Sequence, residues 1–263
     1  MKIIRAVKPN AGIQLAYQRD MEKLIDDVNR SVVYWVRKEY RKREPQIAMD
    51  SAASAMGKVL ARLFKYWLDK WTGRANSIAE RFIKSNKKKT QSSYVEAFKA
   101  AGFTVKPNPS RILNDTVEAL IAENVALITS IPERYFSEIT ELVQRCVAQG
   151  RNIKQLEEEI YKRYYVSRKR AKLIARDQTN KACFAIRRAR DLSLGITEGK
   201  WVHFAGTKYY RETHRCMNGK RFNLTKGLYD SDVKKYVLPT ELVNCCCTYR
   251  AIIPEFGDDN KKS

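Results

Sequence analysis

Cysteine and histidine residues cluster in two short stretches of the second half of the sequence. ELVNCCCTYRAII contains Cys245, Cys246 and Cys247 side by side, and the earlier RETHRCMNGKRF contains His214 and Cys216. A structural zinc ion needs four thiolate or imidazole ligands at tetrahedral positions. If the three cysteines begin a strand, the first and third side chains share a face and the second points away. The sequence therefore predicts one structural zinc ion, bound by His214, Cys216, Cys245 and Cys247.

The spacing of these residues leaves a second interpretation open. Each pair of predicted ligands is separated by a single residue, whereas zinc fingers usually place about two to four residues between paired ligands. The alternative is a set of reduced, partly buried thiols, which cysteine favours in any case. Cys146 and Cys183 fall within predicted helices and are expected in the core.

Residues for catalysis are scarce. A hydrolytic zinc site keeps an open coordination position and a carboxylate as general base, and Glu212 is the only close carboxylate. The sequence has no HExxH helix and no glycine-rich phosphate loop. Its two histidines, His203 and His214, leave few nucleophile–base pairs. These observations predict a protein that is not an enzyme and has no small-molecule substrate.

Basic residues far outnumber acidic ones, with 51 Lys and Arg against 29 Asp and Glu, a net charge of +22 and a pI near 9.8. Such a balance favours a polyanion partner, of which nucleic acid is the commonest. The alternative is a basic structural protein that lies against an acidic surface. No apolar run approaches the roughly 18 residues of a membrane span. No apolar core follows the basic start, so a secretory signal is not expected, and the thiols are expected in a reducing cytoplasm.

Helical periodicity dominates the first 195 residues, where apolar residues recur every three or four positions. Breaks are expected at Pro45 and Pro132 and in the linker GFTVKPNPS, Gly73 is expected to kink or end a helix, and Ser167 is expected to cap one. After Gly195, KWVHFAG and CTYRAIIP read as short strands. The sequence therefore predicts a mainly α protein, with a multi-helix body and a small C-terminal α+β cap clasped by the zinc ion.

Two apolar stripes are expected to form core. An aromatic stripe could in principle stack on bases, but at helical spacing it indicates core packing. It consists of Leu60, Phe64, Trp67, Leu68 and Trp71. A stripe of mostly small residues would let a neighbouring helix approach closely. Its members are Ala171, Ala175, Gln178, Ala182, Ile186, Ala189 and Ser193.

Two basic groups are predicted to contact a polyanion. The first lies in KSNKKKTQSSYVEAF, read as a basic hinge before a helix start, and is either a phosphate-binding loop or a solvated one. The second shares one face of the helix after Ser167, where like charges repel unless phosphate or an acidic partner neutralises them or solvent screens them. The predicted contacts are Lys87, Lys88, Lys89, Arg168, Lys169, Lys172, Arg176, Arg187 and Arg190.

Several motifs follow one another in a fixed order from about residue 128 to 254. They are IPERY, GRNIKQL, SRKRAKLIARDQTNK, a tryptophan, the R..H....GKRF pattern and a final NCxC. In this the chain resembles the Mu F-like family of phage head-morphogenesis, or minor head, proteins. The residues that carry the resemblance are Arg176, Trp201, Arg211, His214, Gly219, Asn244, Cys245 and Cys247. The predicted regions are a basic helical N-terminal region (1–106), a helical region of head-morphogenesis type (107–195) and the cap with its tail (196–263).

The resemblance implies a structural virion protein, present in few copies, that associates with the portal or the inner capsid. It implies a role in capsid assembly and in DNA packaging or delivery, with portal and capsid proteins and double-stranded DNA as partners. The expected location is the virion, and the host cytoplasm during assembly. Binding to DNA without sequence preference would fall steeply with salt. A free nucleic-acid-binding zinc protein and a nuclease or toxin-type enzyme are the alternatives.

Two positions depart from the family. The family usually has an acidic residue seven positions before the motif histidine, where this chain has Thr207. It usually lacks a cysteine two positions after that histidine, where this chain has Cys216. The two changes suggest that Cys216 replaces the missing carboxylate as the fourth zinc ligand.

Overall fold

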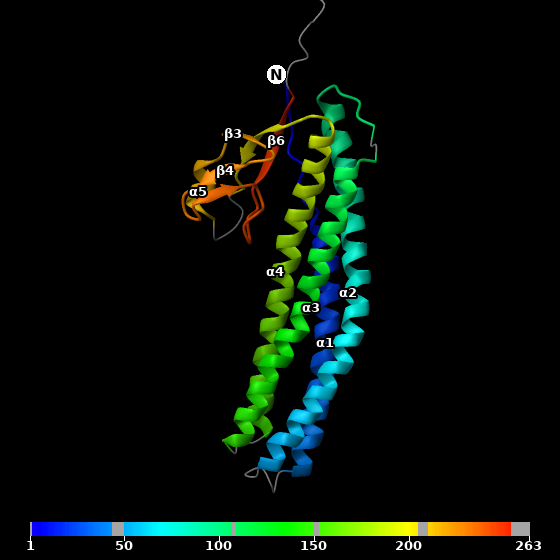
Figure 1. Ribbon diagram of the computed structural model, residues 1–263, viewed down its shortest axis with the longest axis vertical. Helices are drawn as coiled ribbons and strands as arrows, with labels where there is room; N and C mark the ends of the chain where they lie inside the picture. The colour runs from blue at the N-terminus through cyan, green and yellow to red at the C-terminus, as the bar shows by residue number, and fades with distance from the viewer. Residues whose placement is uncertain (1, 44–49, 107–108, 150–152, 205–209, 254–263) are drawn as a thin grey trace, which may run out of the picture. The chain divides into compact units, whose positions relative to one another are not determined.

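The computed structural model describes residues 2–43, 50–106, 109–149, 153–204 and 210–253. Its helices and the strands β3, β4 and β6 are labelled in Figure 1. The helices are α1 (Ala11–Arg43), α2 (Asp50–Ala100), α3 (Arg111–Ala148), α4 (Ile153–Ser193) and α5 (Glu212–Cys216). The strands are β1 (Lys2–Ile4), β2 (Glu198–Val202), β3 (Arg221–Asn223), β4 (Leu228–Asp230), β5 (Lys235–Val237) and β6 (Thr248–Ile253). The predicted mainly α fold with a small C-terminal strand region is confirmed.

The chain divides into two compact units. The helical unit contains residues 14–81 and 121–175, and the mixed unit contains residues 1–13, 82–120 and 176–263. Both units combine segments that are distant in the sequence, so neither corresponds to one of the three predicted regions. The boundaries of those regions stay predictions.

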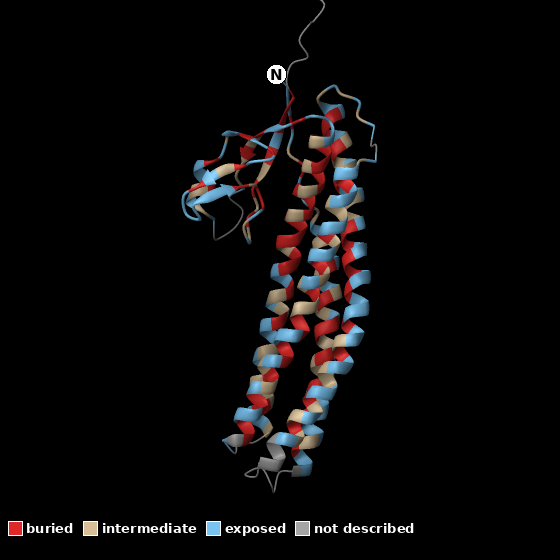
Figure 2. Ribbon diagram, viewed as in Figure 1, coloured by how far each residue is buried: buried red, intermediate tan, exposed pale blue. Residues whose placement is uncertain are grey.

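In the helical unit, segments of α1 to α4 lie side by side and bury one face each (Figures 1 and 2). The aromatic stripe of α2 packs as predicted, with Leu60, Trp67 and Trp71 buried and Phe64 and Leu68 half-buried. The small-residue stripe of α4 is likewise buried, apart from Ser193 at its end. Its buried members are Ala171, Ala175, Gln178, Ala182, Ile186 and Ala189. In the part of the chain that the structure describes, none of the helices is apolar over a length that could cross a membrane.

A helix end at Gly73, a break at Pro132 and a helix start at Ser167 are wrong, because α2, α3 and α4 continue through these three positions. The Ser167 hydroxyl does not cap a helix and instead donates a 3.1 Å hydrogen bond back to the carbonyl of Arg163, inside α4. The predicted basic hinge is likewise part of α2. The break at Pro45 lies outside the described residues. The linker between α2 and α3 is present where it is described.

The mixed unit is built on a four-stranded antiparallel sheet of order β1-β6-β2-β3, beside a β4-β5 hairpin. β2 and β6 are the two strands that the sequence predicts. The edge strand β1 was not predicted, because three residues carry too little periodicity. Its pairing of Ile4 with Ala251 joins the N-terminal segment to the C-terminal strand. Aromatic side chains from this sheet and from α2 and α4 form the core, among them Trp201, Tyr249, Tyr94 and Phe184.

Candidate metal centre

Three side chains that could hold a metal ion come together in the mixed unit: His214, Cys245 and Cys247. His214 Nδ1 lies 3.3 Å from Cys245 Sγ and 3.7 Å from Cys247 Sγ. All three residues are buried. One imidazole and two thiols in a dry site match the ligand chemistry that zinc prefers. The structure thus brings together three of the four predicted ligands.

The imidazole of His214, in α5, is oriented by a carboxylate and an aromatic ring. Its Nε2 lies 3.1 Å from Oδ2 of Asp230, which is fully buried in β4. The other oxygen of Asp230 accepts a 3.0 Å hydrogen bond from the backbone amide of Asp232. Trp201 packs edge-on against the imidazole, with ring centroids 5.4 Å apart. These contacts leave Nδ1 facing the thiols, and a carboxylate behind the ring is the usual way to orient a metal-binding histidine.

The cysteine loop is anchored to α4 through Asn244. The backbone of Asn244 has a φ of 64°, a left-handed conformation that asparagine tolerates better than most residues. Its amide donates to Asp177 Oδ1 at 2.8 Å, and its side-chain oxygen accepts a hydrogen bond from the Arg176 guanidinium. Arg176 therefore anchors the cysteine loop. The structure gives it this role and not the polyanion contact that the sequence predicted.

The three cysteines diverge as predicted, although by a different geometry. β6 begins at Thr248, so the cysteines lie in the irregular segment before it and not in a strand. Cys245 and Cys247 are buried, whereas Cys246 is half-buried and faces Asn180 Nδ2 at 3.4 Å. The backbone amide of Thr240 donates to Cys245 Sγ at 3.3 Å, a contact that favours the thiolate.

Charge in the centre is shared between the two thiols and the imidazole. Hydrogen bonding from Cys247, and then from His214, holds the pKa of the Cys245 thiol well below its usual range against the effect of burial. The same hydrogen bond to Cys245, together with burial, raises the pKa of Cys247. Burial lowers the pKa of His214, but the Cys245 hydrogen bond and the charges of Cys245 and Asp230 outweigh it, so the net shift is upward. The site thus favours a Cys245 thiolate beside a His214 imidazolium. A bound cation could neutralise the same negative sulfur in place of the imidazolium.

Cys216 does not join this group, and its predicted place in the site is wrong. It is exposed, whereas His214 is buried. The prediction paired them because a single residue separates them, as it does Cys245 and Cys247. Both lie in α5, where two residues correspond to about 200° of rotation. The two side chains therefore leave opposite sides of the helix.

His203 is the residue near the centre that the prediction missed. It follows β2, and its Nδ1 lies 3.5 Å from Cys247 Sγ. Burial lowers the pKa of its imidazole, which favours the neutral form. A signal was present in the sequence, because His203 and His214 are its only two histidines. Asp230 was also missed, since nothing in its local sequence marks a buried carboxylate.

Two other motif residues support the same region. Arg211 donates a 3.2 Å hydrogen bond to the carbonyl of Val243, in the loop that leads to the cysteines. Gly219 has a φ of 82°, and its amide donates to the carbonyl of Trp201 at 2.8 Å, which closes the turn after α5 onto β2. Thr207 lies outside the described residues. The motif residues that the structure describes thus belong to the group that could hold a metal or position it.

Two arginines of the predicted basic face are buried, which contradicts a surface role in polyanion binding. Arg187 is 1% exposed, donates a 2.7 Å hydrogen bond to the carbonyl of Tyr249 and lies 3.6 Å from the carboxylate of Asp191. Arg190 is 7% exposed and donates to Gln91 Oε1 at 3.0 Å. Helical periodicity placed them on one face but could not show that other residues of the mixed unit, such as Tyr249 of β6, cover this end of it.

The remaining members of that face lie in the helical unit. Arg168 bonds the carboxylates of Glu22 at 2.8 Å and Asp26 at 2.6 Å, so its charge is largely matched within the unit. Lys169 and Lys172 are exposed. The predicted contact surface on α4 is thereby reduced to these two lysines.

Comparison with known proteins gives a family for this region. Residues 137–250 match the family model described as phage Mu protein F like protein. An uncharacterized protein of Haemophilus influenzae is 26% identical over 259 residues, which cover 92% of this chain and 54% of the relative, so the chain spans about half the length of that relative. No solved structure matches the chain significantly. The matched region includes all the motif residues from Arg176 to Cys247, and the match supports the assignment of residues 137–250 to the phage Mu F-like family.

Proposed function

We propose that the chain is a minor head protein of a tailed phage. It acts in capsid assembly and in DNA packaging or delivery, bound near the portal or the inner capsid. The observation that carries this proposal is the Mu F-like match over residues 137–250, since this family indicates a phage head morphogenesis protein. The net charge of +22 supports a position next to packaged DNA.

The role that we propose is structural, without turnover. One zinc ion bound at the metal centre would connect α5 to the loop before β6, two segments far apart in the sequence. The binding free energy of a structural zinc ion contributes directly to folding. The Asp230 carboxylate, which a hydrolytic site would need as a free base, is instead bonded to His214 and to the amide of Asp232.

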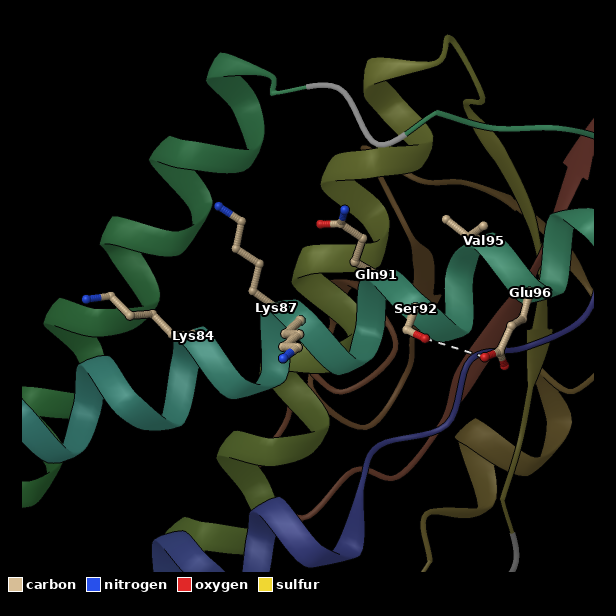
Figure 3. A pocket seen from close by; sticks show the side chains of 7 residues that line it. Lys84, Lys87, Gln91, Ser92, Val95 and Glu96 are labelled. Atoms are coloured by element: carbon tan, nitrogen blue, oxygen red, sulfur yellow. Dashed lines mark hydrogen bonds between the residues drawn. The ribbon is translucent and has the colours of Figure 1, made fainter.

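We place the DNA contact on α2 in the mixed unit. Figure 3 shows an open groove along this helix, with Lys84 and Lys87 at one end and Glu96 at the other, and Lys88 also lines it. The three lysines recur at positions i, i+3 and i+4, so their side chains project from one side of the helix. Lys89 is exposed but lies about 140° around the helix from Lys84 and about 200° from Lys87, outside this row. Sequence-independent phosphate contact needs such a row of ammonium groups and no base-reading side chain.

Removal of the lysine row tests the DNA contact. A variant with Lys84→Gln, Lys87→Gln and Lys88→Gln should bind any duplex more weakly. Each lost phosphate contact should reduce the slope of log K against log salt by about 0.9, a total of roughly 2 to 3. The control variant loses the same charge at exposed sites elsewhere on α2, by Lys58→Gln, Lys65→Gln and Lys99→Gln. If the slope of log K against log salt is the same in the two variants, the DNA contact does not lie in this groove.

Quantitative mass spectrometry of purified particles from the source system tests the role itself. A few copies per particle, far below the major shell protein, is the expected result. Absence from both particles and proheads would overturn the proposal. Sequence-selective DNA binding would then favour a free nucleic-acid-binding protein. Metal-dependent degradation of nucleic acid that His214→Ala abolishes would favour an enzyme.

A further inference from the structure

We propose that His203 is the fourth ligand of the zinc ion and completes a Cys2His2 site with His214, Cys245 and Cys247. This inference rests on the zinc centre proposed above and assigns the fourth coordination position of the ion. His203 takes the place of Cys216, the residue that the sequence favoured.

The distances in the centre match the edges of a zinc tetrahedron. With zinc–nitrogen bonds of about 2.0 Å and zinc–sulfur bonds of about 2.3 Å, neighbouring ligand atoms lie roughly 3.3 to 3.8 Å apart. His214 Nδ1 is 3.3 and 3.7 Å from the sulfur atoms of Cys245 and Cys247. His203 Nδ1 is 3.5 Å from Cys247 Sγ, within the same range. His203 therefore meets Cys247 at the separation of a fourth ligand. Its nitrogen atoms are not within 4.8 Å of all three other ligand atoms, so its ring would move toward His214 and Cys245 when the ion binds.

The surroundings of His203 also favour a ligand. Its backbone amide is fixed by Asn218 Oδ1 at 2.9 Å, and its ring packs against Tyr210 with centroids 5.8 Å apart. Among the residues that the structure describes, its buried Nε2 has no hydrogen-bond partner, while Nδ1 faces the Cys247 sulfur. A positioned imidazole directed at a thiol that another imidazole already contacts is the arrangement that a shared metal ion requires.

The other nearby donors are turned away or already engaged. Cys216 leaves the opposite side of α5 and is exposed. Cys246 faces Asn180 and the carbonyl of Asn244. Both oxygens of Asp230 are bonded, one to His214 and one to a backbone amide, so Asp230 orients a ligand without being one.

With His203 as a ligand, the zinc ion joins three segments: the end of β2, helix α5 and the irregular segment before β6. β2 and β6 are paired through five residue pairs from Glu198–Ile252 to Val202–Thr248. The ion would close the sheet at the Val202–Thr248 end of this pair, where backbone pairing stops. Such a site stabilises a small core that lacks long strands of its own.

Metal content and cobalt spectra of the full-length chain, purified without chelator, test the assignment. The native chain and Cys216→Ser should each bind one zinc ion with equal affinity. His203→Ala should weaken zinc binding by on the order of 100-fold or more, since even loss of a group behind a ligand costs about 10- to 100-fold. His203→Cys should retain the metal, and its thiolate-to-cobalt absorption should rise by about half because three thiolates replace two.

The outcomes separate this inference from the zinc proposal itself. If the native chain contains no zinc and takes up no cobalt, the zinc centre is wrong. If the native chain binds zinc and His203→Ala binds it equally well, only the assignment of His203 is wrong. If Cys216→Ser loses the metal, Cys216 is the fourth ligand instead. Circular dichroism of each apo variant, compared with the apo native chain, identifies a variant that fails to fold. If His203→Ala fails to fold, the metal content and cobalt spectrum of His203→Cys decide the assignment.

Discussion

The indole Nε1 of Trp71 donates a 3.0 Å hydrogen bond to the backbone carbonyl of Ile128. In a regular helix that carbonyl would accept the amide of residue 132, but Pro132 has no amide hydrogen. Trp71 is 1% and Ile128 0% exposed, so water does not reach the carbonyl. Helix α2 thus supplies the donor that α3 lacks, which explains how α3 continues through a proline.

The first prediction concerns this pair, measured as a double-mutant cycle in urea unfolding. Trp71→Phe should reduce the free energy of unfolding by about 1–3 kcal/mol for the unpaired buried carbonyl, in addition to the loss of packing. In a Pro132→Ala background the alanine amide can bond the carbonyl, so the same substitution should cost less. The coupling between the two sites should be about 1–2 kcal/mol. Strict additivity would show that the carbonyl does not need Trp71.

The same pair shows what the sequence could and could not predict. Trp71 was expected in the core because helical spacing identifies buried faces, and this is confirmed. Gly73 and Pro132 were expected to interrupt helices because their local preferences oppose helix, and Ser167 was expected to cap one because serine favours that position. The penalties of glycine and proline amount to about 1–3 kcal/mol, which tertiary contacts can outweigh.

The candidate metal centre was also predictable only in part. Cys245, Cys247 and His214 followed from ligand chemistry and spacing. The choice between Cys216 and His203 depends on whether RETHRC forms a strand or a helix and on how β2 ends. Neither is encoded in the spacing of the ligands. Arg187 was misplaced for a related reason, because a helix face that looks basic can be covered by a sheet.

The second prediction concerns the continuity of α2. Gly73→Ala should raise the free energy of unfolding by about 0.5–1 kcal/mol, because glycine is the poorer residue in a helix interior. An added Cβ at this position meets no atom within 4 Å. If a helix instead ended at Gly73 with a left-handed backbone, alanine would destabilise the protein. Gly227→Ala is the contrasting variant, since φ is 83° and the Cβ would lie 2.1 Å from the Val237 carbonyl oxygen. It should cost well over 1 kcal/mol.

The third prediction concerns the anchor of the cysteine loop. Asp177→Ala leaves the backbone amide of Asn244 without its 2.8 Å acceptor and should cost about 1–3 kcal/mol of stability. Zinc affinity should fall by about 10-fold, because the adjacent cysteines lose their orientation. Asp177→Asn retains an acceptor oxygen and should lose less than half as much of both. Lys181→Ala removes only the 2.9 Å ion pair of Asp177 and should leave zinc affinity unchanged. Equal zinc affinity in Asp177→Ala and the native chain would show that the Asp177–Asn244 hydrogen bond does not orient the cysteines for metal binding.

The fourth prediction concerns the buried carboxylate of Asp191. It is 0% exposed and accepts hydrogen bonds from Tyr94 at 2.8 Å and Tyr249 at 2.6 Å. Burial raises its pKa, whereas the charge of Arg187 and the two tyrosine hydrogen bonds lower it, and the net shift is upward. Removal of a tyrosine hydroxyl should therefore raise the pKa of Asp191 further.

The stability of Tyr249→Phe should consequently depend on pH. A carboxyl whose folded-state pKa lies above its unfolded value of 3.8 stabilises the fold at low pH and loses that contribution as pH rises through the folded-state pKa. The loss caused by Tyr249→Phe should be about 1.5–3 kcal/mol at neutral pH, where the carboxylate lacks a donor, and smaller in acid. Tyr135→Phe is the matched control, because the Tyr135 hydroxyl donates to the uncharged side chain of Asn29 at 2.8 Å. Its loss should be the same at both pH values, and a Tyr249→Phe loss that is equally constant would mean that Asp191 does not titrate across this range.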